Sequence, residues 1–406
     1  KEQRTDRIDR VMTGKWTGLP VFLVIMALVF FLTFTIGDWL KGYFETGLEL
    51  LTGAAGSALE AWGVAPALQS LLVDGIISGV GGILTFLPNI FILFLALAFL
   101  EDSGYMSRVA FVMDGIMGKL GLSGRAFLPM LLGFGCSGPA VMASRALEDN
   151  RDRLKTILIT PFMSCSARLP IYVLFSSMFF GKYAMIACYS MYLLGIVVAI
   201  ATAYILSKID GSRAEHSLLI ELPEYKTPNA RTIAVYVWEK VKDYLTKAGT
   251  VIFLASIVMW LLLNFGPSGY VTDISESFGS IIGKAVVPVF RPLGLGYWQI
   301  IVALISGIAA KEVVVSSCSV LFGVNNITGG AGMEQLAALL GTMGFGAANA
   351  YALMVFCLLY VPCTATIATI NREVGSKKIT FGIIMFQLVT AWVVSFIAYH
   401  IAGLVL

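Results

Sequence analysis

Long apolar stretches alternate with short polar ones along most of this chain. Seven of these stretches reach about 18 residues or more, the length that an α-helix needs to cross a hydrocarbon core of roughly 30 Å. They occupy residues 19–36, 83–100, 156–180, 183–206, 248–265, 350–370 and 379–406. The pattern therefore predicts an all-α protein that crosses a membrane several times.

The composition of the chain supports this interpretation. The chain has 406 residues, of which 58% are hydrophobic and 13% charged, whereas about 25% of the residues in soluble domains are charged. Its mean hydropathy is +0.84, so the lipid bilayer is its expected environment. The net charge of +3 gives no reason to expect nucleic acid as a partner. The six cysteines lack the spacing of a disulfide framework.

Lys and Arg are distributed unevenly among the polar connections, and this distribution predicts the orientation of the helices. Cytoplasmic loops of membrane proteins carry an excess of these residues. They are frequent in residues 1–18, 144–155 and 208–247, whereas residues 37–82 contain Lys41 alone. We therefore expect a cytoplasmic N-terminus and an outer location for residues 37–82.

Two Gly-rich apolar stretches, 126–143 and 298–322, do not fit simple crossings. Basic residues flank the first stretch on both sides, so both of its ends are expected in the cytoplasm. It is therefore predicted to be a re-entrant hairpin that turns around the sequence GFGCSGPA, where glycine and proline permit the bend. Few basic residues flank the second stretch, so we expect a hairpin that is entered from outside.

Each predicted hairpin is followed by a long crossing that proline interrupts. The first crossing contains PFMSCSARLP and the second contains LLYVPCTATIATI, so a proline, a cysteine, a small hydroxyl residue and an alanine recur. The expected fold is thus an inverted repeat of two units, each a re-entrant hairpin plus a broken transmembrane helix. Such repeats place substrate sites near the midplane of the membrane, where broken helices expose backbone groups to a cavity.

Three cysteines lie at the predicted helix breaks: Cys136 in the first hairpin, and Cys165 and Cys363 in the interrupted crossings. A thiolate suits a transition metal, and a helix break gives a cation access to it. A buried cysteine also packs like a small hydrophobe. Packing is the interpretation adopted for the other three cysteines, Cys188, Cys318 and Cys357.

Three charged residues lie deep in apolar sequence, where an isolated charge costs at least a few kcal/mol. Arg168 and Lys311 are expected to have structural roles, as ion-pair partners or as anchors at helix ends. Glu312 fits a metal ligand and a counter-ion equally well. The hydroxyls of Ser164 and Ser166, together with Glu312, are expected to be weaker or transient metal ligands.

Five motifs follow one another over nearly the whole chain: FLEDSGYMSRVAFVMDGIM, GLSGRAFLPMLLGFGCSGPAVMASRALE, RDRLKTILITPFMSCSARLPIY, AAKEVVVSS and LLYVPCTATIATINREVGS. Together they closely resemble the membrane region of the FeoB family of prokaryotic ferrous iron transporters, including its two Gate segments. One position differs, because Ser137 and Gly138 follow the first Gate cysteine where the family commonly has Asn-Val or Ser-Val.

The resemblance implies transport of Fe²⁺ across the bacterial inner membrane into the cytoplasm. In the family a GTP-binding domain and a helical spacer precede the membrane region, whereas this sequence contains no GxxxxGK[ST] phosphate loop. We therefore expect no enzyme activity from the chain by itself, with GTP and Mg²⁺ acting only through that domain. The expected partners are the GTP-binding domain, small cytosolic Feo accessory proteins and further copies of the chain in a homo-oligomer.

The expected organisation has five parts. They are a cytosolic junction (1–18), N-terminal transmembrane helices with amphipathic segments (19–125), the first Gate repeat (126–207), a cytosolic loop with an amphipathic helix (208–247), and the second Gate repeat with the C-terminal helix (248–406).

A nucleoside-type secondary transporter is the alternative function, because such transporters also combine hairpins with broken helices. It would need amide and carboxylate side chains at the hairpin tips to bind a base and a ribose, whereas the first tip offers Cys136 and Ser137. A membrane-embedded enzyme has no support in the sequence, which shows no His cluster, no paired catalytic carboxylates and no nucleophile motif.

Overall fold

The computed structural model describes residues 9–10, 12–14, 17–210, 226, 228–271, 273–324 and 330–405. Nearly all of this chain is helical, and the strands within it are β1 (Phe265–Gly266) and β2 (Gly269–Tyr270), which pair in one short antiparallel hairpin. The prediction of an all-α polytopic membrane protein is confirmed. Most of the predicted junction 1–18 and the middle of the predicted loop 208–247 lie outside the described residues.

The chain divides into two compact units. The first comprises Lys1–Thr160 and Ile200–Phe253, and the second comprises Pro161–Ala199 and Leu254–Leu406. Each unit is therefore discontinuous in sequence, and each is described by itself below.

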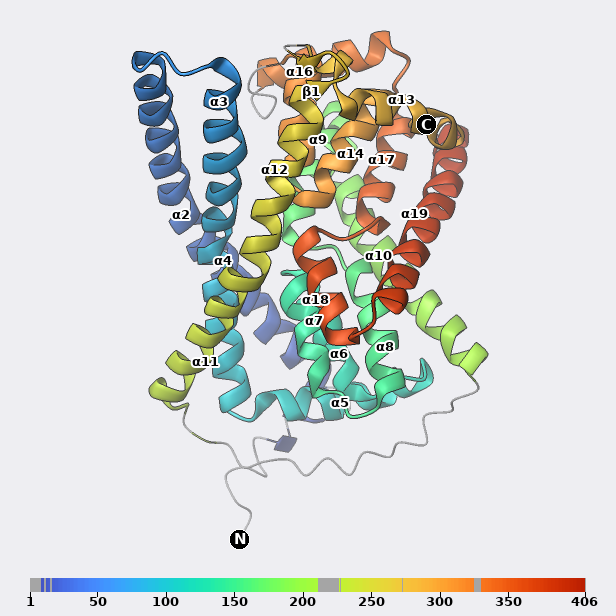
Figure 1. Ribbon diagram of the computed structural model, residues 1–406. Helices are drawn as coiled ribbons and strands as arrows, with labels where there is room; N and C mark the ends of the chain where they lie inside the picture. The colour runs from blue at the N-terminus through green and yellow to red at the C-terminus, as the bar shows by residue number, and fades with distance from the viewer. Residues whose placement is uncertain are drawn as a thin grey trace. The chain divides into compact units, whose positions relative to one another are not determined.

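The first unit begins with two long helices. Helix α2 (Gly18–Ala61) packs against α4 (Ser78–Asp102), and the two lie side by side in Figure 1. Between them lie α3 (Pro66–Ser70) and the π-helical segment η1 (Leu71–Ile77).

Helix α2 extends well past residue 36, where the predicted crossing ends. Its added part is rich in Leu, Ala and Glu, which favour helix, and contains no proline. The helix ends near Gly63, whose φ of 66° is the left-handed conformation that commonly follows a helix. The hydrophobic pattern therefore predicted only the apolar first half of α2.

The rest of the first unit follows a sharp bend after α4. Helix α5 (Tyr105–Lys119) turns by 84° from the end of α4, and Gly104 permits this turn with a φ of 79°. Buried Arg108 forms an ion pair with Asp9, which ties the start of the described chain to α5. The unit also contains η2 (Gly124–Ala126), α6 (Phe127–Leu132), α7 (Ser137–Ala143), η3 (Ser144–Ala146), α8 (Asn150–Ile159) and α11 (Ala230–Asp243).

Helix α11 lies within residues 208–247, where the sequence predicts an amphipathic helix. Its first turn is capped by Asn229, whose side chain accepts a hydrogen bond from the Arg231 N–H. The Asn229 backbone N–H in turn donates to Asp102 at the end of α4, against which α11 packs.

The remaining helices belong mostly to the second unit. In chain order these are η4 (Thr160–Phe162) at the unit boundary, η5 (Ser166–Arg168), α9 (Leu169–Phe180), η6 (Gly181–Tyr183), α10 (Ala184–Asp210), η7 (Tyr244–Gly249), α12 (Thr250–Asn264), η8 (Ile274–Glu276), α13 (Phe278–Phe290), η9 (Arg291–Leu293), α14 (Trp298–Ala309), α15 (Val313–Phe322), α16 (Gly330–Thr342), α17 (Ala347–Leu359), α18 (Thr364–Val374) and α19 (Lys377–Val405). Segment η7 and the ends of α10 and α12 belong to the first unit.

Helix α17 forms the core of the second unit. Its residues from Ala352 to Leu359 are all buried, and it packs along α19, beside which it lies in Figure 1. The Ser395 hydroxyl of α19 donates to the Ala352 carbonyl oxygen, so the contact includes a buried polar bond. A helix that is apolar on all sides is expected in this central position.

Four helical stretches within the described chain are long and apolar enough to cross a bilayer, or up to six if two bent pairs are included. Two of the seven predicted crossings, 156–180 and 183–206, fall within one of these stretches, 150–209. The predicted crossing 248–265 is helical, but its apolar helix, Phe253–Asn264, is shorter than a full span. Helix α13 was not predicted, since its residues lay in an expected outer connection.

Candidate functional site

The first interrupted crossing is broken where the sequence predicted. Helix α8 ends at Ile159, and α9 begins at Leu169 with Pro170 in its first turn, where proline is tolerated. Between them Cys165 is extended, with φ −76° and ψ 159°, at the start of η5. The break leaves backbone carbonyl groups without helical partners.

The second interrupted crossing repeats this local structure. Helix α17 ends at Leu359, α18 begins at Thr364, and Pro362 lies between them. Cys363 precedes α18 with φ −62° and ψ 156°, nearly the backbone conformation of Cys165. Its Sγ lies 3.2 Å from the Thr366 hydroxyl. The two cysteines therefore occupy equivalent positions, as the sequence comparison predicted.

Both predicted hairpins are also interrupted. In the first unit α6 and α7 pack against each other, and Cys136 between them is extended, with φ −149° and ψ 127°. In the second unit α14 and α15 pack together, and Ala310 has nearly the same conformation, with φ −151° and ψ 137°. The second hairpin thus lacks a thiol at the position that corresponds to Cys136.

Arg168 is an anchor for the freed carbonyl groups of the first break. Its side chain is 1% exposed, and its Nη1 donates to the carbonyl oxygens of Pro161 and Met163, each at 3.1 Å. A guanidinium group is suited to this task because it presents several donors in a fixed plane. The predicted structural role of Arg168 is confirmed.

Lys311 has the corresponding role at the second break. It lies between α14 and α15, is 2% exposed, and its Nζ donates to the carbonyl oxygen of Val361. The same Nζ lies 3.2 Å from the centre of the Tyr360 ring, a cation–π contact. The predicted structural role of Lys311 is confirmed.

The hairpin that carries Lys311 contacts both interrupted crossings in the second unit. Thr364, next to Cys363, donates to the carbonyl oxygen of Ala309 at the end of α14, and α15 packs against α9, which follows the first break. The second hairpin therefore meets the second break and contacts the helix that follows the first break.

The remaining predicted ligands occupy different settings. Ser164 is fully buried, and its hydroxyl donates to the Tyr172 hydroxyl at 3.1 Å. Ser166 and Glu312 are partly exposed. Cys136 belongs to the first unit. No group of three or more His, Cys, Asp or Glu residues stands ready to hold a metal ion within the described part of the chain.

The three cysteines assigned to packing are buried or partly buried. Cys318 and Cys357 are at most 1% exposed, as a packing role requires. Cys188 lies 3.2 Å from the Ser176 hydroxyl. Cys188 is partly exposed and lies on α10 rather than at a helix break, so it is a suitable control for the three break cysteines.

Sequence reasoning missed two tyrosines and a threonine at the breaks. The Tyr360 ring lies under the Lys311 amine, and the Tyr172 hydroxyl accepts a hydrogen bond from Ser164. The Thr364 hydroxyl donates to the carbonyl oxygen of Ala309 at 3.1 Å. All three lie inside or directly beside the proline-containing motifs. A polar aromatic residue next to a helix break was therefore a usable signal.

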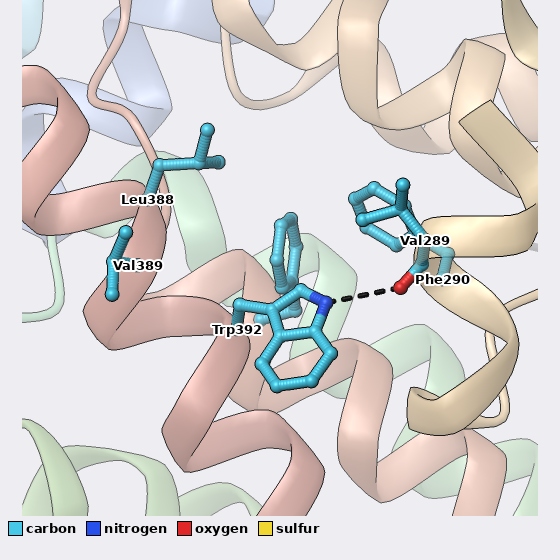
Figure 2. A pocket seen from close by; sticks show the side chains of 6 residues that line it. Val289, Phe290, Leu388, Val389 and Trp392 are labelled. Atoms are coloured by element: carbon cyan, nitrogen blue, oxygen red, sulfur yellow. Dashed lines mark hydrogen bonds between the residues drawn. The ribbon is translucent and has the colours of Figure 1, made fainter.

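A groove on the second unit has the wrong chemistry for a cation. It has a volume of about 290 Å³ and is lined by Val289, Phe290, Phe356, Leu388, Val389 and Trp392, as Figure 2 shows. The indole N–H of Trp392 is already engaged, because it donates to the Val289 carbonyl oxygen at 3.0 Å. Apolar walls offer no ligand to a divalent ion, so the helix breaks are the candidate site.

Comparison with known proteins agrees with this geometry. The Gate family, described as nucleoside recognition, matches residues 83–179 and 245–377, which together are more than half of the chain. The family described as the ferrous iron transport protein B C terminus matches residues 188–240.

Curated relatives match over the whole chain. The Fe(2+) transporter FeoB of Campylobacter jejuni is 39% identical over 421 residues, covering 100% of this chain and 67% of its own length. The chain belongs to the FeoB family. The FeoB of Staphylococcus aureus strain MSSA476 is 42% identical over 406 residues, 100% of this chain and 60% of its own length. The FeoB of Methanocaldococcus jannaschii is 40% identical, with 98% of this chain and 59% of its own length covered.

This FeoB family member thus spans about 60% of the length of the Staphylococcus aureus relative. In Porphyromonas gingivalis a relative named Fe(2+) transport protein A/Fe(2+) transporter FeoB fusion protein is 36% identical, over 98% of this chain and 51% of its own length. No solved structure matches the chain.

Proposed function

We propose that this chain is the membrane part of a ferrous iron transporter and moves Fe²⁺ across the bacterial inner membrane into the cytoplasm, with its N-terminus on the cytoplasmic side. The names of the FeoB relatives support the substrate. The observation that carries the proposal is the pair of equivalent helix breaks, each with a cysteine in the same extended conformation next to freed backbone carbonyls.

The ligands at these breaks suit Fe²⁺ in transit. Cys165 and Cys363 supply soft sulfur ligands, and the hydroxyls of Ser164 and Ser166 and the Glu312 carboxylate supply harder oxygen ligands, a mixture that matches a cation of intermediate softness. The same set binds Zn²⁺ at least as strongly, so geometry and metal supply set the selectivity. Few strong ligands make a site from which the ion leaves easily, as transport requires.

Cys136 is proposed to serve the same route from the first hairpin. It lies in extended backbone between α6 and α7, and it is partly exposed. The five-part division of the chain, from the junction 1–18 to the second Gate repeat 248–406, is kept as part of this proposal.

We also propose that transport is regulated by a GTP-binding domain joined to this chain near Arg10, through which GTP and Mg²⁺ act. The greater length of the relatives supports a further domain. The Porphyromonas gingivalis fusion supports an Feo accessory protein as a partner, and assembly as a homo-oligomer is part of the same proposal.

The test compares single cysteine variants in cells that lack other ferrous iron uptake. Cys136→Ser, Cys165→Ser and Cys363→Ser are measured against Cys188→Ser, with expression level and uptake of Fe²⁺, Zn²⁺, Mn²⁺ and labelled nucleosides as readouts. Serine is a harder and weaker ligand, so we expect the three break variants to lose Fe²⁺ uptake by about tenfold or more at normal expression, while Cys188→Ser retains it. Each variant is made with the chain alone and joined to a GTP-binding domain, and only the joined form should show regulated uptake.

Two results would contradict the proposal. Uptake in proportion to expression for all four variants would exclude the thiolate route. Nucleoside uptake without metal uptake would favour the function suggested by the description of the Gate family.

A further inference from the structure

Lys311 makes the contacts that a free cation would make at a helix break. Its amine is buried, donates a hydrogen bond to the carbonyl oxygen of Val361 and lies over the face of the Tyr360 ring. Carbonyl oxygens and aromatic faces are the ordinary partners of buried cations. The Val361 carbonyl is available because the helix is interrupted at Pro362, and the protein's own amine now occupies it.

The tip of the second hairpin is tied to the break by two further hydrogen bonds. The Tyr360 hydroxyl donates to the Leu304 carbonyl oxygen at 3.2 Å, and the Thr364 hydroxyl donates to the Ala309 carbonyl oxygen at 3.1 Å. Gly307 allows this close approach, since a Cβ there would lie 2.4 Å from the Tyr360 hydroxyl oxygen. The packing of α14 against the break therefore brings Lys311 next to the Val361 carbonyl oxygen.

A metal ion can reach the Val361 carbonyl oxygen only if the Lys311 amine leaves it, because the amine already occupies this oxygen. Arg168 is fixed by two carbonyl oxygens of its own break, whereas Lys311 holds one oxygen through a flexible four-carbon chain. Lys311 is thus the group that moves.

We propose that the Lys311 amine occupies the place of the transported cation at the Val361 carbonyl oxygen, so that the metal and Lys311 compete for this oxygen. Lys311 is then a positioning residue that keeps the second break closed until a divalent ion displaces it. This inference rests on the proposed function, because it concerns the ion that the breaks carry. It gives Lys311 a role in ion entry, in addition to the proposed passage of the ion past the three break cysteines.

Competition makes a kinetic prediction. If the amine occupies the oxygen about nine-tenths of the time, the site is available for about one-tenth, and removing the amine lowers the apparent KM for Fe²⁺ by about tenfold. Lys311→Met removes the competitor while keeping an unbranched apolar side chain. Lys311→Arg keeps a cation and should keep a KM close to that of the wild type.

The matched control is Thr364→Val, which loosens the hairpin without removing a cation. Initial rates of Fe²⁺ uptake are measured over a range of concentrations for the wild type and the three variants, each joined to its GTP-binding domain and normalised to expression. A lower KM in Lys311→Met alone supports competition. An equal fall in Thr364→Val would show that hairpin loosening is responsible and would overturn the inference.

A KM of Lys311→Met that equals or exceeds that of the wild type would overturn it too. If Lys311→Met does not accumulate, Lys311→Gln replaces it; its neutral amide is a weaker donor than the amine, so it should lower the KM in the same direction by a smaller factor. Absence of Fe²⁺ uptake by the wild type would instead refute the proposed function. The two failures are therefore distinguishable.

Discussion

Replacement of Arg168 by methionine tests whether the freed carbonyl groups of the first break need a buried donor. In the native protein the Arg168 Nη1 donates to the carbonyl oxygens of Pro161 and Met163, and the side chain is 1% exposed. Methionine is unbranched and fills a similar apolar space, but it leaves both oxygens without this donor.

The size of the effect follows from two contributions. Two hydrogen bonds from a charged donor contribute about 1.5–3 kcal/mol each, or about 3–6 kcal/mol together. The Arg168 Nε has no hydrogen-bond partner among the described residues, and a buried unpaired donor costs about 1–3 kcal/mol, which the variant regains. The expected net loss in free energy of unfolding is about 2–4 kcal/mol.

The assay is reversible unfolding of the purified protein in mixed micelles of mild detergent and dodecyl sulfate, followed by helical circular dichroism. Arg168→Lys should lose less than Arg168→Met, because an ammonium group retains a charge and three donors. Lys182→Met, at an exposed position, is the control and should leave stability unchanged within about 0.5 kcal/mol. An Arg168→Met protein as stable as the wild type would refute the anchoring role.

Two further predictions test the packing of the break and the orientation of the chain. Gly195→Ala in α10 should destabilise the protein by about 1–3 kcal/mol and lower Fe²⁺ uptake, because its Cβ would lie 2.6 Å from the Phe162 carbonyl oxygen at the first break. The control is Gly382→Ala in α19, where a Cβ meets nothing within 4 Å, so neither stability nor uptake should fall. Equal stability of the two variants in the same unfolding assay would contradict the packing argument. The predicted orientation places Asp149 on the cytoplasmic side and Ser275 on the outer side. In a background without native cysteines, a cysteine introduced at Asp149 should resist an impermeant thiol reagent in intact cells, whereas one at Ser275 should react. The opposite result would invert the predicted topology.

Most of the apolar helices, and the helix breaks that carry Cys165 and Cys363, could be predicted from local sequence. Apolar runs specify helices that a bilayer can cover, and proline disfavours a helix interior because it lacks an N–H and clashes with the preceding turn, although α4 and α13 continue through Pro88 and Pro288. For this reason Cys165 and Cys363 could be placed at helix breaks from their neighbours alone. The same reasoning failed for α2, whose second half continues the helix without an unbroken apolar run.

Only the tertiary structure decided which groups satisfy the broken backbone. Lys311 and Val361 are separated by 50 residues, and no local pattern relates an amine in one hairpin to a carbonyl oxygen in a distant crossing. Their pairing arises because a buried donor and a freed acceptor each lose water on folding, so the stable packing is one that brings them together. The charge of Lys311 could be read from the sequence, but its place at the second break is a property of the fold.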